Sequence, residues 1–281
     1  MTMAHPYKQI YGSYEVPKEI HQLHALEQEL NREDLSLEMI GLQPLHDWFT
    51  YPITPPDLIP FAHTGGAGIH FGFLTDFGLT KDLQDAPIVC VSPTNDPPIK
   101  YMARNIGQFF NLASSVPHVE MLDDFWAYDD ATQIQAHIEE FYKDTPNDWA
   151  KKRQAVFTRF QATFGTQQEQ VIPYFQKVQL ERKNRQSLFT LDGLGVIGEN
   201  ASAEGKSYAF DSHHSLNEQE LQRMQDFLKQ ASHLEKLAFI RDAHYRYVVA
   251  PNYDEAVLQI IIELLQSMDL QAELQRVLAR E

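Results

Sequence analysis

The sequence predicts an α+β protein whose first half mixes short strands with helices and whose second half is mostly helical. Two short runs in the first half, residues 69–74 and 88–91, are rich in aromatic or β-branched side chains and predict strands. From residue 146 onward, four long segments repeat apolar side chains at the spacing of an α-helix. Hydrophobic residues make up 43% of the 281-residue chain and charged residues 22%, which is typical of a folded globular protein.

The two strands of the first half lie between two predicted helices. Residues 16–30 carry isoleucine or leucine every three or four positions, which predicts an amphipathic helix. Residues 44–68, which follow it, are rich in proline and glycine and predict turns. Asp96-Pro97-Pro98 predicts a further turn after the second strand. Residues 103–114 predict the second helix, because their isoleucine, phenylalanine and alanine side chains share one face.

The second half is predicted to contain four helices, over residues 146–164, 167–185, 216–240 and 253–278. Residues 187–210 are rich in glycine and short apolar runs, and they predict either a small meander or a loop. The last helix is apolar nearly all round at its start, which is typical of a helix buried in a core or at a subunit interface. We therefore also consider a homo-oligomer that uses the segment beginning at Leu258 and ending at Leu278.

The charge of the chain is divided unevenly along its length. Residues 1–150 hold 7 basic and 22 acidic residues, a net charge of −15, whereas residues 151–281 hold 16 and 17, a net charge of −1. The shift falls near Thr145-Pro146-Asn147-Asp148, where proline ends a preceding helix and Asn or Asp can cap the next one. We predict an acidic α+β domain over residues 1–145 and a mostly helical domain over residues 146–281. The alternative is one continuous domain with an acidic face.

The composition excludes several classes of protein. No apolar stretch approaches the roughly 18 residues that span a bilayer, and the N-terminus lacks the apolar run of a signal peptide. The single cysteine, Cys90, cannot form an internal disulfide bond. These features predict a cytoplasmic protein with no membrane contact. The net charge of −16 argues against direct nucleic-acid binding but suits a basic protein partner that itself binds nucleic acid.

The sequence carries no recognisable catalytic motif. The glycine-rich residues 64–68 lack the Gly-Lys-Ser/Thr ending of a phosphate-binding loop, and they run into a strand instead of opening a helix. Asp76-Phe77-Gly78 matches a kinase triplet, but nothing else of the kinase set is present, so we interpret it as a strand end and its turn. Cys90 lies in an apolar strand, where a thiol is inert. The sequence therefore favours a protein without catalytic residues or a cofactor.

Three side chains near the glycine-rich turn leave an enzyme open as the alternative. His63, His70 and Asp76 could meet at one mouth of the predicted sheet. Such a pocket would suit a metal-dependent or hydrolase-like enzyme, although a metal site needs three or four converging ligands. The commoner role of a histidine is a local hydrogen bond or a position in water, so we predict no metal ligands.

An acidic tract that also carries aromatic residues is the strongest candidate for a binding surface. Carboxylates steer basic partners, and aromatic side chains supply contact area. A solvated acidic surface without a partner is the alternative interpretation. The predicted partner-binding residues are Glu120, Asp123, Asp124, Trp126, Asp129 and Asp130.

A family resemblance covers about a quarter to a third of the chain. The stretch from Gly41-Leu-Gln-Pro-Leu-His-Asp-Trp48 through Leu112 contains Thr54-Pro-Pro-Asp-Leu-Ile-Pro-Phe61, a small-residue turn from Gly65 to Gly68, the two predicted strands and the helix over residues 105–112. In this order of elements the chain resembles the SUKH superfamily, which includes yeast regulators of cell-wall glucan synthesis and many bacterial immunity proteins. The C-terminal helical half lies outside the resemblance.

The resemblance implies a twisted, mainly antiparallel sheet with helices packed against it, and a binding module instead of an enzyme. Bacterial members of the superfamily bind and neutralise toxin domains, through residues that differ between members, so no residue is carried over. Our hypothesis from the sequence is therefore a cytoplasmic, non-enzymatic protein-binding protein. It would act in toxin immunity or regulation by placing an acidic surface over the basic site of a partner, such as a toxin domain.

Overall fold

The computed structural model describes residues 10–143, 146–198, 205–210, 216–248 and 253–279. The chain forms two compact units. Unit 1 comprises Met1–Phe49, Ile59–Thr75 and Thr80–Gln179, and unit 2 comprises Thr50–Leu58, Asp76–Leu79 and Leu180–Glu281. This division does not follow the expected domain boundary, because residues 146–179 belong to unit 1; Thr145 itself lies outside the described residues.

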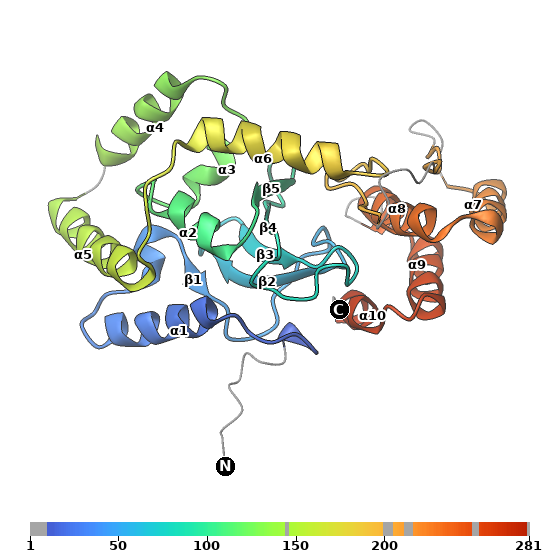
Figure 1. The fold of residues 1–281 in the computed structure, drawn as a ribbon, viewed down its shortest axis with the longest axis horizontal. Helices are drawn as coiled ribbons and strands as arrows, with labels where there is room; N and C mark the ends of the chain where they lie inside the picture. Colours follow the sequence, from blue (N-terminus) through green and yellow to red (C-terminus); the bar gives the residue numbers. More distant parts are fainter. Residues whose placement is uncertain (1–9, 144–145, 199–204, 211–215, 249–252, 280–281) are drawn as a thin grey trace, which may run out of the picture. The chain divides into compact units, whose positions relative to one another are not determined.

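Unit 1 is built on an antiparallel five-stranded sheet, which confirms the predicted α+β class (Figure 1). The strands follow one another across the sheet in chain order, as a meander. They are β1 (Gln43–Pro44), β2 (Leu58–His63), β3 (His70–Leu74), β4 (Ile88–Val91) and β5 (Ile99–Ala103).

The sequence predicted β3 and β4 but neither β2 nor β5. Every residue of β3 and β4 is buried, and Phe71 of β3 pairs with Cys90 of β4. Strands covered on both faces give short continuous apolar runs, which is the pattern that the sequence shows. In β2 the pattern is interrupted by Pro60, and in β5 by Lys100, a charged residue that is nevertheless buried.

Helices pack against this sheet within unit 1. The α1 helix contacts β1 and α5, and the α2 helix contacts β5. The rings of Phe61 and Phe73 lie 4.7 Å apart, and those of Phe71 and Phe109 lie 4.8 Å apart, so the strands and α2 share an aromatic core. Burying each such side chain stabilises the fold by about 1.5–3 kcal/mol. The helices are α1 (Lys18–Asn31), α2 (Ile106–Ala113), α3 (Met121–Phe125), α4 (Ala131–Lys143), α5 (Asn147–Phe164) and α6 (Val171–Arg185), of which α6 ends in unit 2.

Unit 2 is mostly helical, and each of the two long helices expected near the C-terminus is divided in two. The first division follows α7, because Ser232 caps α8: its hydroxyl accepts the Glu235 N–H, and the Glu235 carboxylate accepts the Ser232 N–H. The second follows α9, where Asp269 takes a positive φ of 58°. The elements are α7 (Glu218–Gln230), α8 (His233–Ala243), α9 (Glu255–Ser267) and α10 (Gln271–Leu278).

The apolar start of α9 lies in the core of unit 2. Five of its side chains are buried, together with residues of α8 and α10: Val257, Ile260, Ile261, Leu264 and Leu265. Leu258 is partly buried and packs against the same core, whereas Leu278 of α10 is 48% exposed. Among the helices that the structure describes, none combines the length and the apolarity needed to cross a membrane.

Candidate functional site

Asp123, one of the six predicted partner-binding residues, is buried. Its Oδ1 lies 2.5 Å from Nζ of Lys100, and the side chains of the two residues are only 1% and 3% exposed. The Asn95 amide donates a second hydrogen bond to Asp123, and Sγ of Cys90 lies 3.7 Å from its Oδ1. Asp123 therefore does not belong to the accessible surface, because its charge is needed to balance a lysine inside the sheet.

The other four predicted acids are accessible and form what we call the acidic surface: Glu120, Asp124, Asp129 and Asp130. Glu120 precedes α3 and Asp124 lies in it, with side chains that are 45% and 47% exposed. Asp129 and Asp130 are exposed immediately before α4, where Oδ1 of Asp130 accepts the Thr132 N–H at 2.8 Å. This hydrogen bond lowers the pKa of Asp130 and keeps it ionised.

The described residues supply no lysine or arginine that neutralises the acidic surface. In the described part of the chain, no lysine or arginine forms an ion pair with any of the four acids; their neighbours are His118, 3.8 Å from Glu120, and His137, 3.7 Å from Asp124. Burial, helped by the nearby charge of Arg153, lowers the pKa of His118 to about 4, so its ring is neutral at pH 7. Burial and the charges of Asp124 and Asp123 raise the pKa of Glu120.

Trp126 anchors the segment that carries these acids. Its ring is half-buried, and its indole N–H donates a 3.0 Å hydrogen bond to the carbonyl oxygen of Tyr101 in β5. The N–H group of the indole is therefore already hydrogen-bonded within unit 1. Only the exposed part of the half-buried Trp126 side chain is available to a partner.

The α4 helix, which continues from the acidic surface, has no buried residue. It is amphipathic, and its apolar residues Ile134, Ile138 and Phe141 are only half-buried, while Tyr142 is 47% exposed. Helices draw most of their stability from packing an apolar face, so α4 is the weakly packed helix of unit 1.

His63 and His70, the two histidines of the alternative enzyme hypothesis, make local hydrogen bonds. Nδ1 of His63 accepts the Gly65 N–H at 3.1 Å, and Nδ1 of His70 lies 2.8 Å from the Gly68 carbonyl oxygen. The ring of Phe49 stacks on His63 and meets His70 edge-on. Burial lowers the pKa of His70 to about 4. Within the described ranges, no three His, Cys, Asp or Glu side chains are grouped so that they could hold a metal ion.

Asp76, the third member of that hypothesis, belongs to a buried charge network in unit 2. Its two carboxylate oxygens accept hydrogen bonds of 2.8 and 2.6 Å from the guanidinium of Arg182. Arg241 binds Asp57 at 2.6 Å and Asp192 at 3.1 Å, and it lies 3.7 Å from Asp76. As the sequence predicted, Asp76 ends a strand and opens a turn: it follows β3, and residues 76–78 all have positive φ.

The buried charge network is structural. The side chains of Asp57 and Arg241 are 0% exposed, so no substrate reaches them. Burial raises the pKa of Asp57 to about 6, although the Arg241 charge opposes this shift. The network joins the loops Thr50–Leu58 and Asp76–Leu79 to the helices of unit 2.

Comparison with known proteins adds no assignment, since no family model, no curated protein and no solved structure matches the chain. The site therefore has to be judged on its own geometry. Of the predicted residues, the four acids of the acidic surface are accessible, Trp126 is half-buried and Asp123 is buried. The sequence analysis missed Lys100 and the neutral state of His118, because both depend on contacts between distant segments.

Proposed function

We propose that this chain is a non-enzymatic protein-binding protein that docks a basic partner through the acidic surface. The observation that carries the proposal is the unneutralised charge of four acids, whose only basic partners within the described residues are histidines: Glu120, Asp124, Asp129 and Asp130. A basic partner would supply the missing positive charges. Such complementarity raises the rate of association and favours one orientation of the partner.

The mode of action would be occlusion of the partner's basic site. The acidic surface supplies steering, and the half-buried apolar side chains of the adjacent α4 helix supply contact area that a partner can cover. The proposed setting is the cytoplasm, where the chain would give immunity to a toxin domain or regulate an intracellular partner. The resemblance to the SUKH superfamily supports this choice of setting.

The experiment is a capture from host lysate with the tagged chain, eluted by a salt gradient. The test variant neutralises the acidic surface with Glu120→Gln, Asp124→Asn, Asp129→Asn and Asp130→Asn. The control variant neutralises four exposed acids elsewhere in unit 1: Glu15→Gln, Glu29→Gln, Asp34→Asn and Asp85→Asn.

The proposal predicts a basic protein that the wild type and the control variant release at moderate salt and that the test variant does not retain. Electrostatic docking weakens steeply as salt screens the charges. If the test variant retains the same protein up to the same salt concentration, the acidic surface is not the docking site. The homo-oligomer considered above is tested in parallel by light scattering of the purified chain over a range of concentrations.

A further inference from the structure

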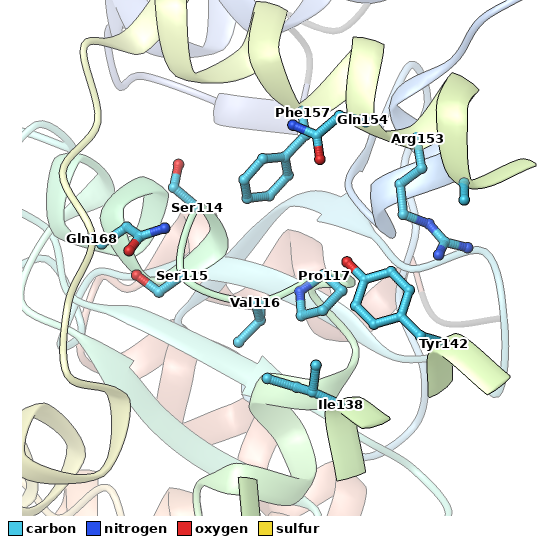
Figure 2. Close-up of a pocket in the computed structure, with 11 residues that line it drawn as sticks. Ser114, Ser115, Val116, Pro117, Ile138, Tyr142, Arg153, Gln154, Phe157 and Gln168 are labelled. Atoms are coloured by element: carbon cyan, nitrogen blue, oxygen red, sulfur yellow. The ribbon is translucent and has the colours of Figure 1, made fainter. Parts of the chain in front are cut away.

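A cavity of about 380 Å³ lies in unit 1, beside α4 and α5 and separate from the four acids of the acidic surface. Its walls come from α4, from α5, from the segment Ser114–Pro117 after α2 and from Gln168. Figure 2 shows Arg153 and Tyr142 at one end and the two serines with Gln168 at the other. Apolar side chains lie between them, those of Val116, Pro117, Ile138 and Phe157, and the Gln154 amide lies beside Phe157. Small-molecule sites commonly have this volume, and here polar groups share the walls with apolar side chains.

Arg153, at one end of the cavity, has no counter-ion among the residues that the structure describes. Its Nε–H donates to the Met39 carbonyl oxygen at 3.0 Å, and its guanidinium carbon lies 4.4 Å from the centre of the Phe141 ring. Within the described ranges, Nη1 is buried without an acceptor and Nη2 makes no hydrogen bond. In the described part of this acidic chain, no carboxylate forms an ion pair with Arg153. Burial also lowers its pKa, so the environment leaves the positive charge poorly compensated.

Some of the remaining polar groups of the cavity already form hydrogen bonds within the protein, and others do not. The Ser114 hydroxyl donates to Thr166 at 2.5 Å, and the Ser115 hydroxyl donates to the Asn111 carbonyl oxygen at 2.7 Å. The Tyr142 hydroxyl and the Gln168 amide make no hydrogen bond with other described residues. Among the described residues, the donors left without a hydrogen bond are thus two guanidinium nitrogens, one phenol and one amide, while the Gln154 amide, which also lines the cavity, donates to Thr158 at 3.4 Å.

We propose that this cavity binds a small organic monocarboxylate with an apolar body. The carboxylate would accept a charge-assisted hydrogen bond from Nη2 of Arg153, and the apolar body would lie between Phe157 and the floor of Val116 and Ile138. A dianion such as a phosphate ester is disfavoured, because the neighbouring His118 is neutral and supplies no second positive charge. This inference concerns a site outside the acidic surface, and it does not depend on the proposed docking function.

Binding would also stabilise α4. Ile138 and Tyr142 project from this helix, which otherwise has no buried residue, into the wall of the cavity (Figure 2). A ligand between them and α5 would give α4 a packed face. The amide hydrogens of α4 would then exchange more slowly with solvent.

The test uses the full chain and two probes of equal shape, 4-phenylbutyrate and its uncharged analogue 4-phenylbutanamide, measured by calorimetry. The wild type is expected to bind the acid roughly tenfold or more tightly than the amide, since hydrogen bonds to charged groups are the stronger ones. Arg153→Gln should bring the ratio of the two affinities close to one. Arg159→Gln is the matched control: it removes the same charge from an exposed position of α5, paired with Glu33, and should leave the ratio unchanged.

A second variant keeps the test decisive if Arg153→Gln does not fold. Ala150→Trp fills the cavity from α5 and should abolish binding of both probes, together with the slowed exchange in α4. The proposal is overturned if the wild type shows no saturable binding of the acid up to about 10 mM, or if it binds acid and amide equally. It is also overturned if Ala150→Trp binds the acid as tightly as the wild type does. A further contrary result would be that the acid does not bind, while Arg153→Gln abolishes capture of a protein from the lysate.

Discussion

Replacing Arg241 by methionine tests whether the buried charge network holds unit 2 together. The guanidinium is 0% exposed and compensates three carboxylates, at 2.6 Å from Asp57, 3.1 Å from Asp192 and 3.7 Å from Asp76. Methionine keeps the bulk but leaves Asp57 buried without this cation. Removing one partner of a buried ion pair costs about 3–5 kcal/mol, a large fraction of the roughly 5–15 kcal/mol that stabilises a typical domain.

The assay should report on unit 2 itself. Tryptophan fluorescence is unsuitable, because Trp48, Trp126 and Trp149 all belong to unit 1. Native-state hydrogen exchange of the α8 and α9 amides follows unit 2 directly. We expect their opening free energy to fall by about 3–5 kcal/mol in Arg241→Met. In the control Lys229→Met, which breaks an exposed pair with Asp226, we expect a change of less than about 1 kcal/mol.

Two further measurements test whether the loss of stability in Arg241→Met comes from the buried charge of Asp57. The pKa of Asp57 is raised to about 6 in the folded chain, so the folded state binds a proton more readily than the unfolded state. The destabilisation from its buried charge is therefore full above pH 6 and is relieved as the pH falls through 6. The deficit of Arg241→Met should be smaller at pH 5 than at pH 7.5, and adding Asp57→Asn should restore part of the stability at pH 7.5. A loss no larger than that of Lys229→Met would refute this account of the network.

Three more predictions concern unit 1. Asp123→Asn leaves Lys100 buried without its carboxylate and should lower the free energy of unfolding by about 3–5 kcal/mol. Asp124→Asn, at an exposed site, should change the free energy of unfolding by less than about 1 kcal/mol. Thermal melts of both variants check this prediction. The Cys90 thiol is fully buried and its pKa is raised, so a thiol reagent should label it in urea but not in the folded chain. The His118 ring, with a pKa of about 4, should show no protonation by NMR between pH 8 and 5.5, and its contribution to stability should be lost as the pH falls below 6.5 towards 4.

The parts of the fold that the sequence predicted depend on local signals. The runs over residues 69–74 and 88–91 predict β3 and β4 because both strands are fully buried and, apart from His70, carry no polar side chain. The break between α7 and α8 also had a local signal, since Ser232 and Glu235 form the spacing of a capping box. That signal was outweighed by the helical periodicity on either side of it.

The parts that escaped prediction depend on contacts between distant residues. Asp123 looks like a surface acid in the sequence, and only the position of Lys100 in β5 shows that it is buried. Asp57 and Arg241 are 184 positions apart, so no local pattern links them. The same holds for Arg153, because only the folded chain shows that its Nη1 has no acceptor among the described residues.

The assignment of two early loops to unit 2 has a consequence for how the protein is made. A ribosome adding about 5–20 residues each second needs roughly 10–40 s to travel the 184 positions from Asp57 to Arg241. For that interval Asp57 has been synthesised and Arg241, which binds it, has not; Asp76 likewise precedes its partner Arg182 by 106 positions. A fragment that starts at residue 180 would carry Arg182 and Arg241 without Asp57, Asp76 or Phe77. Truncations, fusions and domain exchanges therefore have to keep both loops with the C-terminal helices, even though more than 100 residues separate them along the chain.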